Sequence, residues 1–335
     1  MLKHFDKTAR KDAFTGHDRA AFEEWRKQER SCLSGLLGLD RLSRPNLIHS
    51  EITERVRLSD GILREKVLLE TEEDVTMPLF LLIPPETPKG VFIALPGHLG
   101  GGKYSVAGCY EIPAVREQIE LFHYDYGRRL ARMGYVTVCP DCRGFGERRD
   151  TPFTGDEPER FLNGSCKNLA NMALPLGLTV IGLCVFDGMV LIDYLEQRGG
   201  WPLENLGCIG FSGGGMQTMY LAALDERIKQ AVISGYFYGF RDSLLILNDN
   251  CPCNYVPGLW EHLDMGDILS LFAPKPVFIQ SCENDHLNGP RGLSNVFEQL
   301  AVLRKSYALF DAEDRICHDI RPGEHCFHEE ILKNL

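Results

Sequence analysis

The pattern of hydrophobic and polar positions along the chain changes near residue 90. In residues 1–45, apolar residues recur at close to helical spacing, and Asp18 stands where a helix N-cap is expected. Three strand-like runs follow, at residues 52–58, 63–70 and 78–83. The first two alternate polar and apolar residues around the turn signal Ser59-Asp60-Gly61, so they predict an antiparallel hairpin.

Beyond residue 90, short apolar runs alternate with longer helical patterns. The expected strands are residues 90–95, 135–139, 206–209, 231–234, 276–280 and 307–310. The expected helices are residues 113–133, 176–198, 214–224 and 291–304. This alternation predicts an α/β fold whose central sheet is mostly parallel, with antiparallel N-terminal strands and helices on both faces. Right-handed crossovers then bring the carboxyl ends of the parallel strands to one edge, where ligands bind in such folds.

Composition narrows the class of protein. Of the 335 residues, 44% are hydrophobic and 25% are charged, which are ordinary globular values. The net charge of −11, which no basic run offsets, argues against a nucleic-acid partner. The most apolar stretch, residues 176–186, is shorter than the about 20 residues that a membrane span needs, and the N-terminus lacks the apolar core of an export signal. We therefore expect a cytoplasmic protein without a membrane partner, whose 12 cysteines are thiols.

A candidate nucleophile lies at the end of one expected strand. The motif Gly210-Phe211-Ser212-Gly213-Gly214 follows strand 206–209 and opens helix 214–224. This is G-x-S-x-G between a strand and a helix, the context in which such a serine is a nucleophile. A serine at the tip of so sharp a turn has a strained backbone, and the flanking glycines let strand and helix approach. The alternative is a glycine-rich turn without chemistry; a dinucleotide-binding turn fits poorly because no G-x-G-x-x-G is present.

The motif in this context resembles the α/β-hydrolase superfamily, in which an acid and then a histidine follow the serine along the chain. The resemblance implies Asp285 as the acid, because residues 281–285 follow the expected strand 276–280. It implies His325 as the base, because residues 323–327 resemble the G-H-x-F tail of the family. The alternatives are Glu283 for the acid and His318 or His328 for the base.

The resemblance also implies an oxyanion hole formed by two backbone N–H groups. One belongs to Gly213, the residue after the serine. The other is expected in the loop after strand 90–95, where we choose His98 and keep Leu99 as the alternative. The three glycines at residues 100–102 do not make a P-loop, because no GxxxxGK[ST] pattern is present.

A second motif narrows the branch of the superfamily. Residues 141–147 read D-x-R-G-x-G-E after an expected strand, and hydrolases near the acetyl xylan esterases and dienelactone hydrolases carry a similar loop. We expect this loop to be structural, with Arg143 bonded to nearby carbonyls or carboxylates. Dienelactone hydrolase itself uses a cysteine nucleophile, whereas position 212 is serine, so dienelactone is not the favoured substrate. The resemblance covers roughly residues 90–335.

The segment 240–267 is longer than a plain crossover and is expected to be either a lid over Ser212 or packing for the sheet. Its residues Tyr255 and Trp260, together with Tyr236 just after a strand, are candidate substrate-binding residues that would offer aromatic surface to a sugar ring. The alternative for each is a place in the core.

Cys251-Pro252-Cys253, with or without His262, suggests a metal site. A structural zinc site needs four ligands, and this set is incomplete, so we expect no metal and no cofactor.

We expect residues 1–45 to form a helical extension and residues 46–335 the hydrolase domain, with 240–267 as the lid insertion. The predicted function is a serine esterase that works through an acyl-enzyme. The expected substrate is a short-acyl (acetyl) ester of a carbohydrate-like or small-molecule alcohol. A peptidase of the prolyl-oligopeptidase type and a non-catalytic binding protein are the alternatives. The expected partner is a small-molecule ester, and a homo-oligomer stays open.

Overall fold

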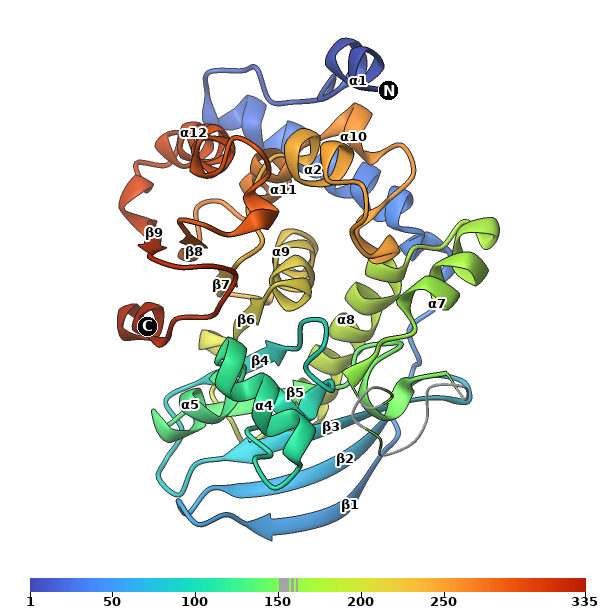
Figure 1. Ribbon diagram of the computed structural model, residues 1–335, viewed down its shortest axis with the longest axis vertical. Helices are drawn as coiled ribbons and strands as arrows, with labels where there is room; N and C mark the ends of the chain where they lie inside the picture. Colours follow the sequence, from blue (N-terminus) through green and yellow to red (C-terminus); the bar gives the residue numbers. More distant parts are fainter. Residues whose placement is uncertain (151–156, 158–159, 161) are drawn as a thin grey trace.

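A central sheet organises the computed structural model, which describes residues 1–150, 157, 160 and 162–335. Within these residues nine strands form one sheet in the order β1-β2-β3-β5-β4-β6-β7-β8-β9 (Figure 1). The strands are β1 Ser50–Arg57, β2 Leu63–Glu72, β3 Val75–Ile83, β4 Val91–Leu95, β5 Val136–Pro140, β6 Gly207–Phe211, β7 Gln230–Ser234, β8 Val277–Cys282 and β9 Ile316–Arg321. Strands β1, β2, β3 and β5 pair antiparallel, and every pair from β5 to β9 is parallel. The predicted α/β class, with antiparallel N-terminal strands on a mostly parallel sheet, is confirmed.

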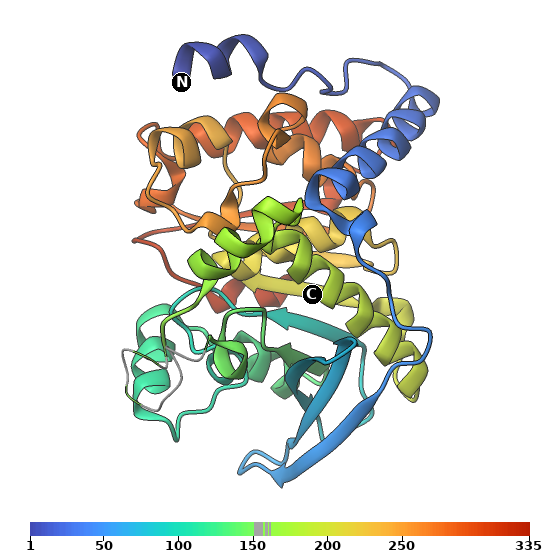
Figure 2. The same ribbon diagram turned by 90° about the vertical axis from the view of Figure 1, so that its right-hand side faces the viewer.

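Helices cover both faces of the sheet, as Figure 2 shows from the side. The α-helices are α1 Leu2–Thr8, α2 Arg19–Leu37, α3 Lys103–Val106, α4 Pro113–Phe122, α5 Tyr126–Arg132, α7 Cys166–Ala173, α8 Val180–Arg198, α9 Gly213–Leu224, α10 Leu259–His262, α11 Met265–Ser270 and α12 Leu293–Ala308. Alternate residues of the strands point to opposite faces, so Val91 and Ile93 belong to the core under α2, α8, α9, α11 and α12. Phe92 and Ala94 belong to the core under α3, α4 and α5. Both faces are therefore buried, which explains the continuous apolar runs of the parallel strands.

The N-terminal segment packs on the first of these cores. The Asp18 carboxylate accepts a hydrogen bond from the Ala21 N–H at 2.9 Å, so the predicted cap begins α2. Phe22, Leu33 and Leu37 are fully buried in the core. Helix α2 thus packs on this core through the apolar stripe that its sequence shows.

The long apolar stretch at residues 176–186 belongs to α8, whose residues are buried from Val180 to Leu195 with few exceptions. Of the helices that the structure describes, none is by itself long and apolar enough to cross a membrane. One bent pair, residues 166–176 and 180–198 at 93°, meets the length and composition together.

The prediction of a strand at residues 307–310 is wrong. Helix α12 continues to Ala308, and the last strand is β9 at Ile316–Arg321. The reason is packing: Val296, Leu300, Leu303 and Tyr307 recur at helical spacing and are all buried. The apolar residues at 307–310 end a helix instead of starting a strand.

A buried ion cluster joins the loops that follow β4 and β5, and the D-x-R-G-x-G-E motif supplies its acids. The Lys103 ammonium is fully buried and donates to Asp141 at 2.5 Å and to Glu147 at 2.6 Å. The Asp141 carboxylate also accepts the backbone N–H groups of Lys103, at 2.8 Å, and Glu147, at 3.0 Å. These bonds hold the loop that begins after β4 in one position.

Arg143, in the same motif, donates to both oxygens of the buried Asp187 carboxylate, at 3.0 and 2.8 Å. It also pairs with Glu72. The expectation that Arg143 bonds nearby carboxylates is confirmed.

Replacement of Tyr307 tests its place on the buried face of α12. Tyr307→Ala should lower the free energy of unfolding by about 3–5 kcal/mol, because it leaves a large cavity. Tyr307→Phe should cost only about 1 kcal/mol, because it removes just the hydrogen bond that the hydroxyl donates to the Lys275 carbonyl. Denaturant unfolding measures both values, and a small loss for the alanine variant would contradict the assignment.

Replacement of Glu147 tests the ion cluster. Burial alone would raise the pKa of Glu147, but the Lys103 ammonium and hydrogen bonds from Lys66 and Tyr104 lower it from the ordinary 4.5 to about 2. A lowered pKa in the folded state stabilises the protein above the unfolded value and is lost as the pH falls towards the folded value. Glu147→Gln should therefore cost about 1–2 kcal/mol near pH 7, a value reduced because water screens the partly exposed carboxylate.

The difference in unfolding free energy between wild type and Glu147→Gln should shrink between about pH 6 and about pH 3. The matched control is Glu73→Gln on the exposed β2–β3 turn, which should change little at any pH. A Glu147→Gln penalty that stays constant over this range would show that the ion pair is not its cause.

Candidate active site

Ser212 lies at the tip of a strained turn between β6 and α9. Its backbone angles are φ 57° and ψ −123°, a conformation that residues with side chains rarely adopt. Strand and helix come so close that a Cβ on Gly210 would collide with the Gly214 backbone, and one on Gly214 with the Leu95 carbonyl. The Ser212 N–H donates to the Ser234 carbonyl of the neighbouring strand at 2.9 Å, which holds the turn. The glycines of the motif are therefore required by the close approach.

Asp285 and His325 meet beside this turn. The His325 Nδ1 and the Asp285 Oδ2 lie 2.6 Å apart, and the Asp285 carboxylate is buried. Its other oxygen accepts the Leu287 N–H at 2.9 Å, which fixes the orientation of the carboxylate. The His325 ring packs on Phe211, the residue before the serine, with ring centroids 4.5 Å apart. Ser212 and His325 line the same cavity.

The alternative bases lie elsewhere. His318 is in β9, where its Nε2 lies 3.1 Å from the Ser281 hydroxyl and burial lowers its pKa to about 4. The ring of His328 faces that of His123. Neither is among the described residues that line the cavity of Ser212. Of the three candidate bases, all of them described residues, His325 alone lies beside both the candidate acid and the serine.

The loop after β4 forms another wall of the cavity. A Cβ on Gly97 would lie 2.7 Å from the Phe211 carbonyl and 3.3 Å from the Ser212 Cβ, so this loop touches the serine turn. The Tyr124 hydroxyl donates to the His98 carbonyl at 2.6 Å, and Leu99 has a positive φ of 62°. His98, Leu99 and Gly213 all line the cavity. The oxyanion assignment to Gly213 and His98, with Leu99 as the alternative, stays a prediction.

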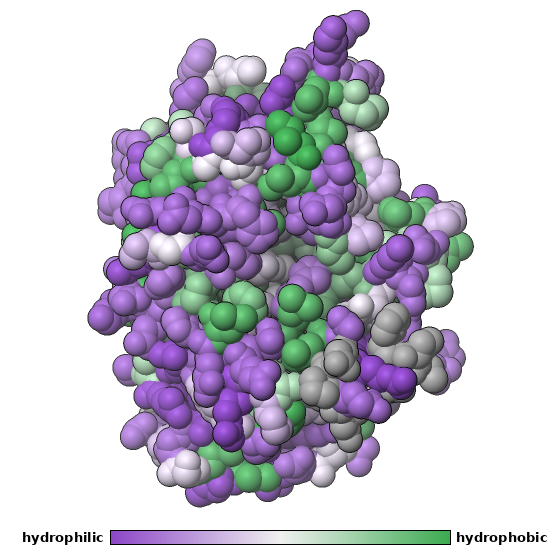
Figure 3. Space-filling view, in the orientation of Figure 1, coloured by the Kyte–Doolittle hydropathy of each residue, from purple (hydrophilic) through white to green (hydrophobic). Residues whose placement is uncertain are grey.

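The cavity has a volume of about 470 Å³, and both polar and apolar side chains line it. Tyr236 and Tyr238 form one side, and burial raises the pKa of both phenols, so they remain hydrogen-bond donors. Sequence reasoning did not single out several further lining residues: Leu247, Asp249, Asn250, Asn254, His286 and Leu287. Most of these follow no motif, and His286 and Leu287 could have been found only by their place beside Asp285. Figure 3 shows this face of the molecule, largely polar and hollowed near its middle.

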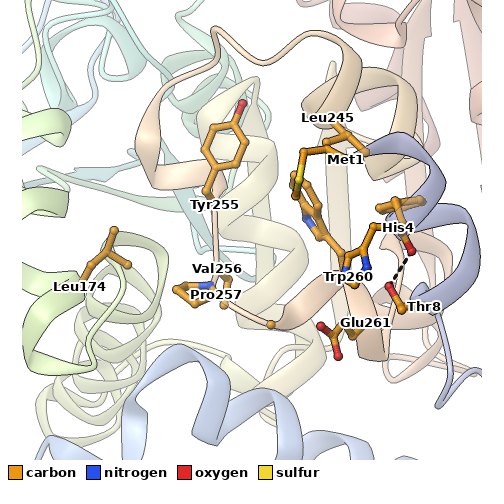
Figure 4. Close-up of a pocket in the computed structure, with 12 residues that line it drawn as sticks. Met1, His4, Thr8, Leu174, Leu245, Tyr255, Val256, Pro257, Trp260 and Glu261 are labelled. Carbon is orange, nitrogen blue, oxygen red and sulfur yellow. Dashed lines mark hydrogen bonds between the residues drawn. The ribbon is translucent and has the colours of Figure 1, made fainter.

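Two of the three predicted substrate-binding aromatics lie outside this cavity. Tyr255 and Trp260 line a separate, mostly apolar pocket of about 380 Å³ with Met1 and Phe5 of the N-terminal segment (Figure 4). The expectation that they shape the cavity of Ser212 is corrected: Trp260 stacks on Phe240 and meets Phe5 edge to face, and this packing turns it away. Tyr236 lines the cavity of Ser212, and its role in binding substrate stays a prediction.

The segment 240–267 contributes to both pockets. The cavity of Ser212 is lined by its residues Leu247, Asp249, Asn250, Cys251 and Asn254. The apolar pocket is lined by its residues 255–258. The Asn254 Oδ1 accepts a hydrogen bond from the Tyr236 hydroxyl at 2.7 Å, which ties the segment to the end of β7.

His262 does not join Cys251 and Cys253. Its Nδ1 lies 2.5 Å from an Asp12 carboxylate oxygen and 3.6 Å from the Cys32 Sγ. The pairing of these two cysteines with His262 is therefore wrong, because α10 directs the imidazole to the N-terminal segment.

Comparison with known proteins concerns the fold. No model of a protein family matches the chain. The Bacillus subtilis (strain 168) protein named "Putative hydrolase YtaP" is 26% identical over 255 residues, which cover 75% of this chain and 79% of that protein. A "putative acetyl xylan esterase" from Bacteroides fragilis NCTC 9343 has a similar structure, with a TM-score of 0.75, 19% identity and coverage of 95% of this chain and 80% of that chain. A glucuronoyl esterase from Solibacter usitatus has a TM-score of 0.69 at 16% identity, with coverage of 98% and 94%. The chain thus has the fold of the α/β-hydrolase superfamily.

Proposed function

We propose that the protein is a serine esterase that cleaves a carbohydrate-like or other small polar ester through an acyl-enzyme. The observation that carries this proposal is the Asp285–His325 pair beside Ser212 at the tip of a strained turn, in one cavity. This is the constellation of a nucleophile, a base and an orienting acid. The similar proteins named as esterases support ester hydrolysis over a binding function.

In the proposed reaction, His325 removes the proton from the Ser212 hydroxyl as the oxygen attacks the ester carbonyl. Asp285 holds the imidazole through Nδ1 and stabilises its charged form. The N–H groups of Gly213 and His98 bind the oxyanion that develops. His325 then gives the proton to the departing alcohol, and water, activated by the same histidine, releases the acid from the acyl-enzyme.

The lining of the cavity favours a polar alcohol and a short acyl group. Asp249 and Asn250 present polar side chains to the cavity, and Tyr236 and Tyr238 present aromatic surface. Aromatic faces beside polar groups suit a sugar ring, which has both apolar C–H faces and hydroxyl groups. The names of the structural neighbours, acetyl xylan esterase and glucuronoyl esterase, point to esters of the same class. We propose acetyl as the preferred acyl group.

Ser212→Ala and His325→Ala should each reduce kcat for ester hydrolysis by ~10⁴–10⁶, because triad members act as a unit. Both variants should remain folded by circular dichroism. A fluorophosphonate probe should label wild type on Ser212 and should not label Ser212→Ala. This labelling also separates an enzyme from a binding protein on the same scaffold.

The matched controls are His318→Ala and His328→Ala, which should retain most of the activity. If His328→Ala lost more activity than the other histidine variants, the assignment of the base would be wrong. Full activity in Ser212→Ala would overturn the serine mechanism.

Among p-nitrophenyl esters from acetate to palmitate, kcat/KM should be highest for the acetate or the butyrate. Each added methylene gains only about 0.8 kcal/mol, and only where it meets apolar surface. In this cavity the polar side chains of Asp249, Asn250 and His286 stand among the apolar ones, so a long acyl chain would also have to cover polar groups. The measurement is kcat/KM for each ester. Trp260→Ala, in the separate apolar pocket, should leave the order of preference unchanged. A maximum at octanoate or a longer ester would contradict the short-acyl proposal and would leave the proposed roles of Ser212, His325 and Asp285 unaffected.

A further inference from the structure

The fold brings three cysteines and one histidine together next to the cavity of Ser212. The ligating atoms of His98, Cys166, Cys251 and Cys253 all lie within 4.8 Å of one another. His98 comes from the loop after β4, Cys166 begins α7, and the two other cysteines flank Pro252 in the segment 240–267. Three parts of the chain that are distant in sequence thus meet at one point.

The distances fit a tetrahedral metal ion. The His98 Nε2 lies 3.3 Å from the Cys253 Sγ and 3.9 Å from the Cys166 Sγ. With Zn–S bonds of about 2.3 Å and Zn–N bonds of about 2.0–2.1 Å, a tetrahedral site separates nitrogen from sulfur by about 3.6 Å. The two observed separations lie on either side of this value, so small shifts would place all four atoms around one ion.

The orientation of the His98 ring also suits coordination through Nε2. A Cβ built on Gly213 would lie 2.6 Å from the His98 Nδ1, so this nitrogen faces the start of α9. The opposite nitrogen therefore points to the thiols. Cys166 and Cys253 are buried, and His98 and Cys251 are half-buried, so bulk water reaches the cluster only in part.

A hydrogen bond from outside the cluster supports the cysteine ligands. The Asn254 side-chain amide donates to the Cys253 Sγ at 3.7 Å and to the Cys251 carbonyl at 3.0 Å. Its Oδ1 accepts the Tyr236 hydroxyl, which fixes which end of the amide faces the sulfur. Donors of this kind orient metal ligands and offset the negative charge of thiolates.

We propose that His98, Cys166, Cys251 and Cys253 bind one zinc ion in a closed tetrahedral site. Three soft sulfur donors and one imidazole select zinc over magnesium or calcium, which require oxygen ligands. Four protein ligands leave no position for substrate, so the ion is structural. It fastens the segment 240–267 and the start of α7 to the loop whose backbone lies beside Ser212. The proposal is independent of the esterase mechanism, and Ser212→Ala should keep its zinc.

The test measures the zinc content of the full chain, produced with zinc in the medium and purified under reducing conditions without chelator. Elemental mass spectrometry should find about one zinc ion per chain. Cys166→Ser and Cys253→Ser should each lose most of it. The matched control is Cys184→Ser, because Cys184 lines the same small cavity as His98, Cys166 and Cys253 but is not one of the four ligands.

Cobalt substitution keeps the test decisive if a cysteine variant fails to fold. Wild type in which Co(II) replaces the metal should show thiolate-to-cobalt charge-transfer bands and the intense visible bands of tetrahedral Co(II). The proposal would be overturned if the wild-type protein binds no zinc after exposure to Zn(II) and shows no such spectrum after exposure to Co(II). It would also be overturned by zinc content unchanged in folded Cys253→Ser, or by a disulfide between two of the three cysteines in the freshly purified protein.

Discussion

The close approach of β6 to α9 is the constraint on which the rest of the site depends. Ser212 keeps a positive φ because strand and helix leave no space for another path, and only glycine fits at Gly210 and Gly214. The strain costs of order 1–3 kcal/mol, which the buried β-strands on both sides offset. In return, the serine lines the cavity beyond the edge of the sheet, together with Gly213 at the start of α9. Every other residue of the site is positioned relative to this turn.

The loops around the turn are each held by a different interaction. The loop after β4 is anchored by the buried Lys103–Asp141 pair, and the loop after β8 by the hydrogen bonds of Asp285. The segment 240–267 is joined to β7 through Asn254 and Tyr236. A buried ion pair contributes little net stability, because desolvation offsets its attraction, but it allows one arrangement of its loops. That specificity suits the loop after β4, whose backbone is proposed to bind the oxyanion.

The proposed zinc site lies at the junction of these loops. His98 contributes its side chain to the cysteine cluster and its backbone to the cavity of Ser212, so the two are coupled through one residue. A closed metal site beside a catalytic cavity provides rigidity without taking part in the chemistry. It also accounts for three thiols and an imidazole converging where hydrophobic packing would have sufficed.

Local sequence determined most of the strands and the turn at Ser212, because apolar periodicity and glycine spacing act over a few residues. The candidate acid and histidine came instead from the resemblance to the α/β-hydrolase superfamily. Local sequence failed at residues 307–310, where a short apolar run fits a strand and a helix end equally well and only the packing of Tyr307 decides. It also failed for Trp260, whose aromatic neighbours include Phe5 from the far end of the chain. The cluster of His98 and Cys166 with Cys251 and Cys253 shows the same limit. Spacing along the chain reveals a ligand pair only when both partners are close in sequence, whereas crossovers of the sheet bring these loops together from segments more than 150 residues apart.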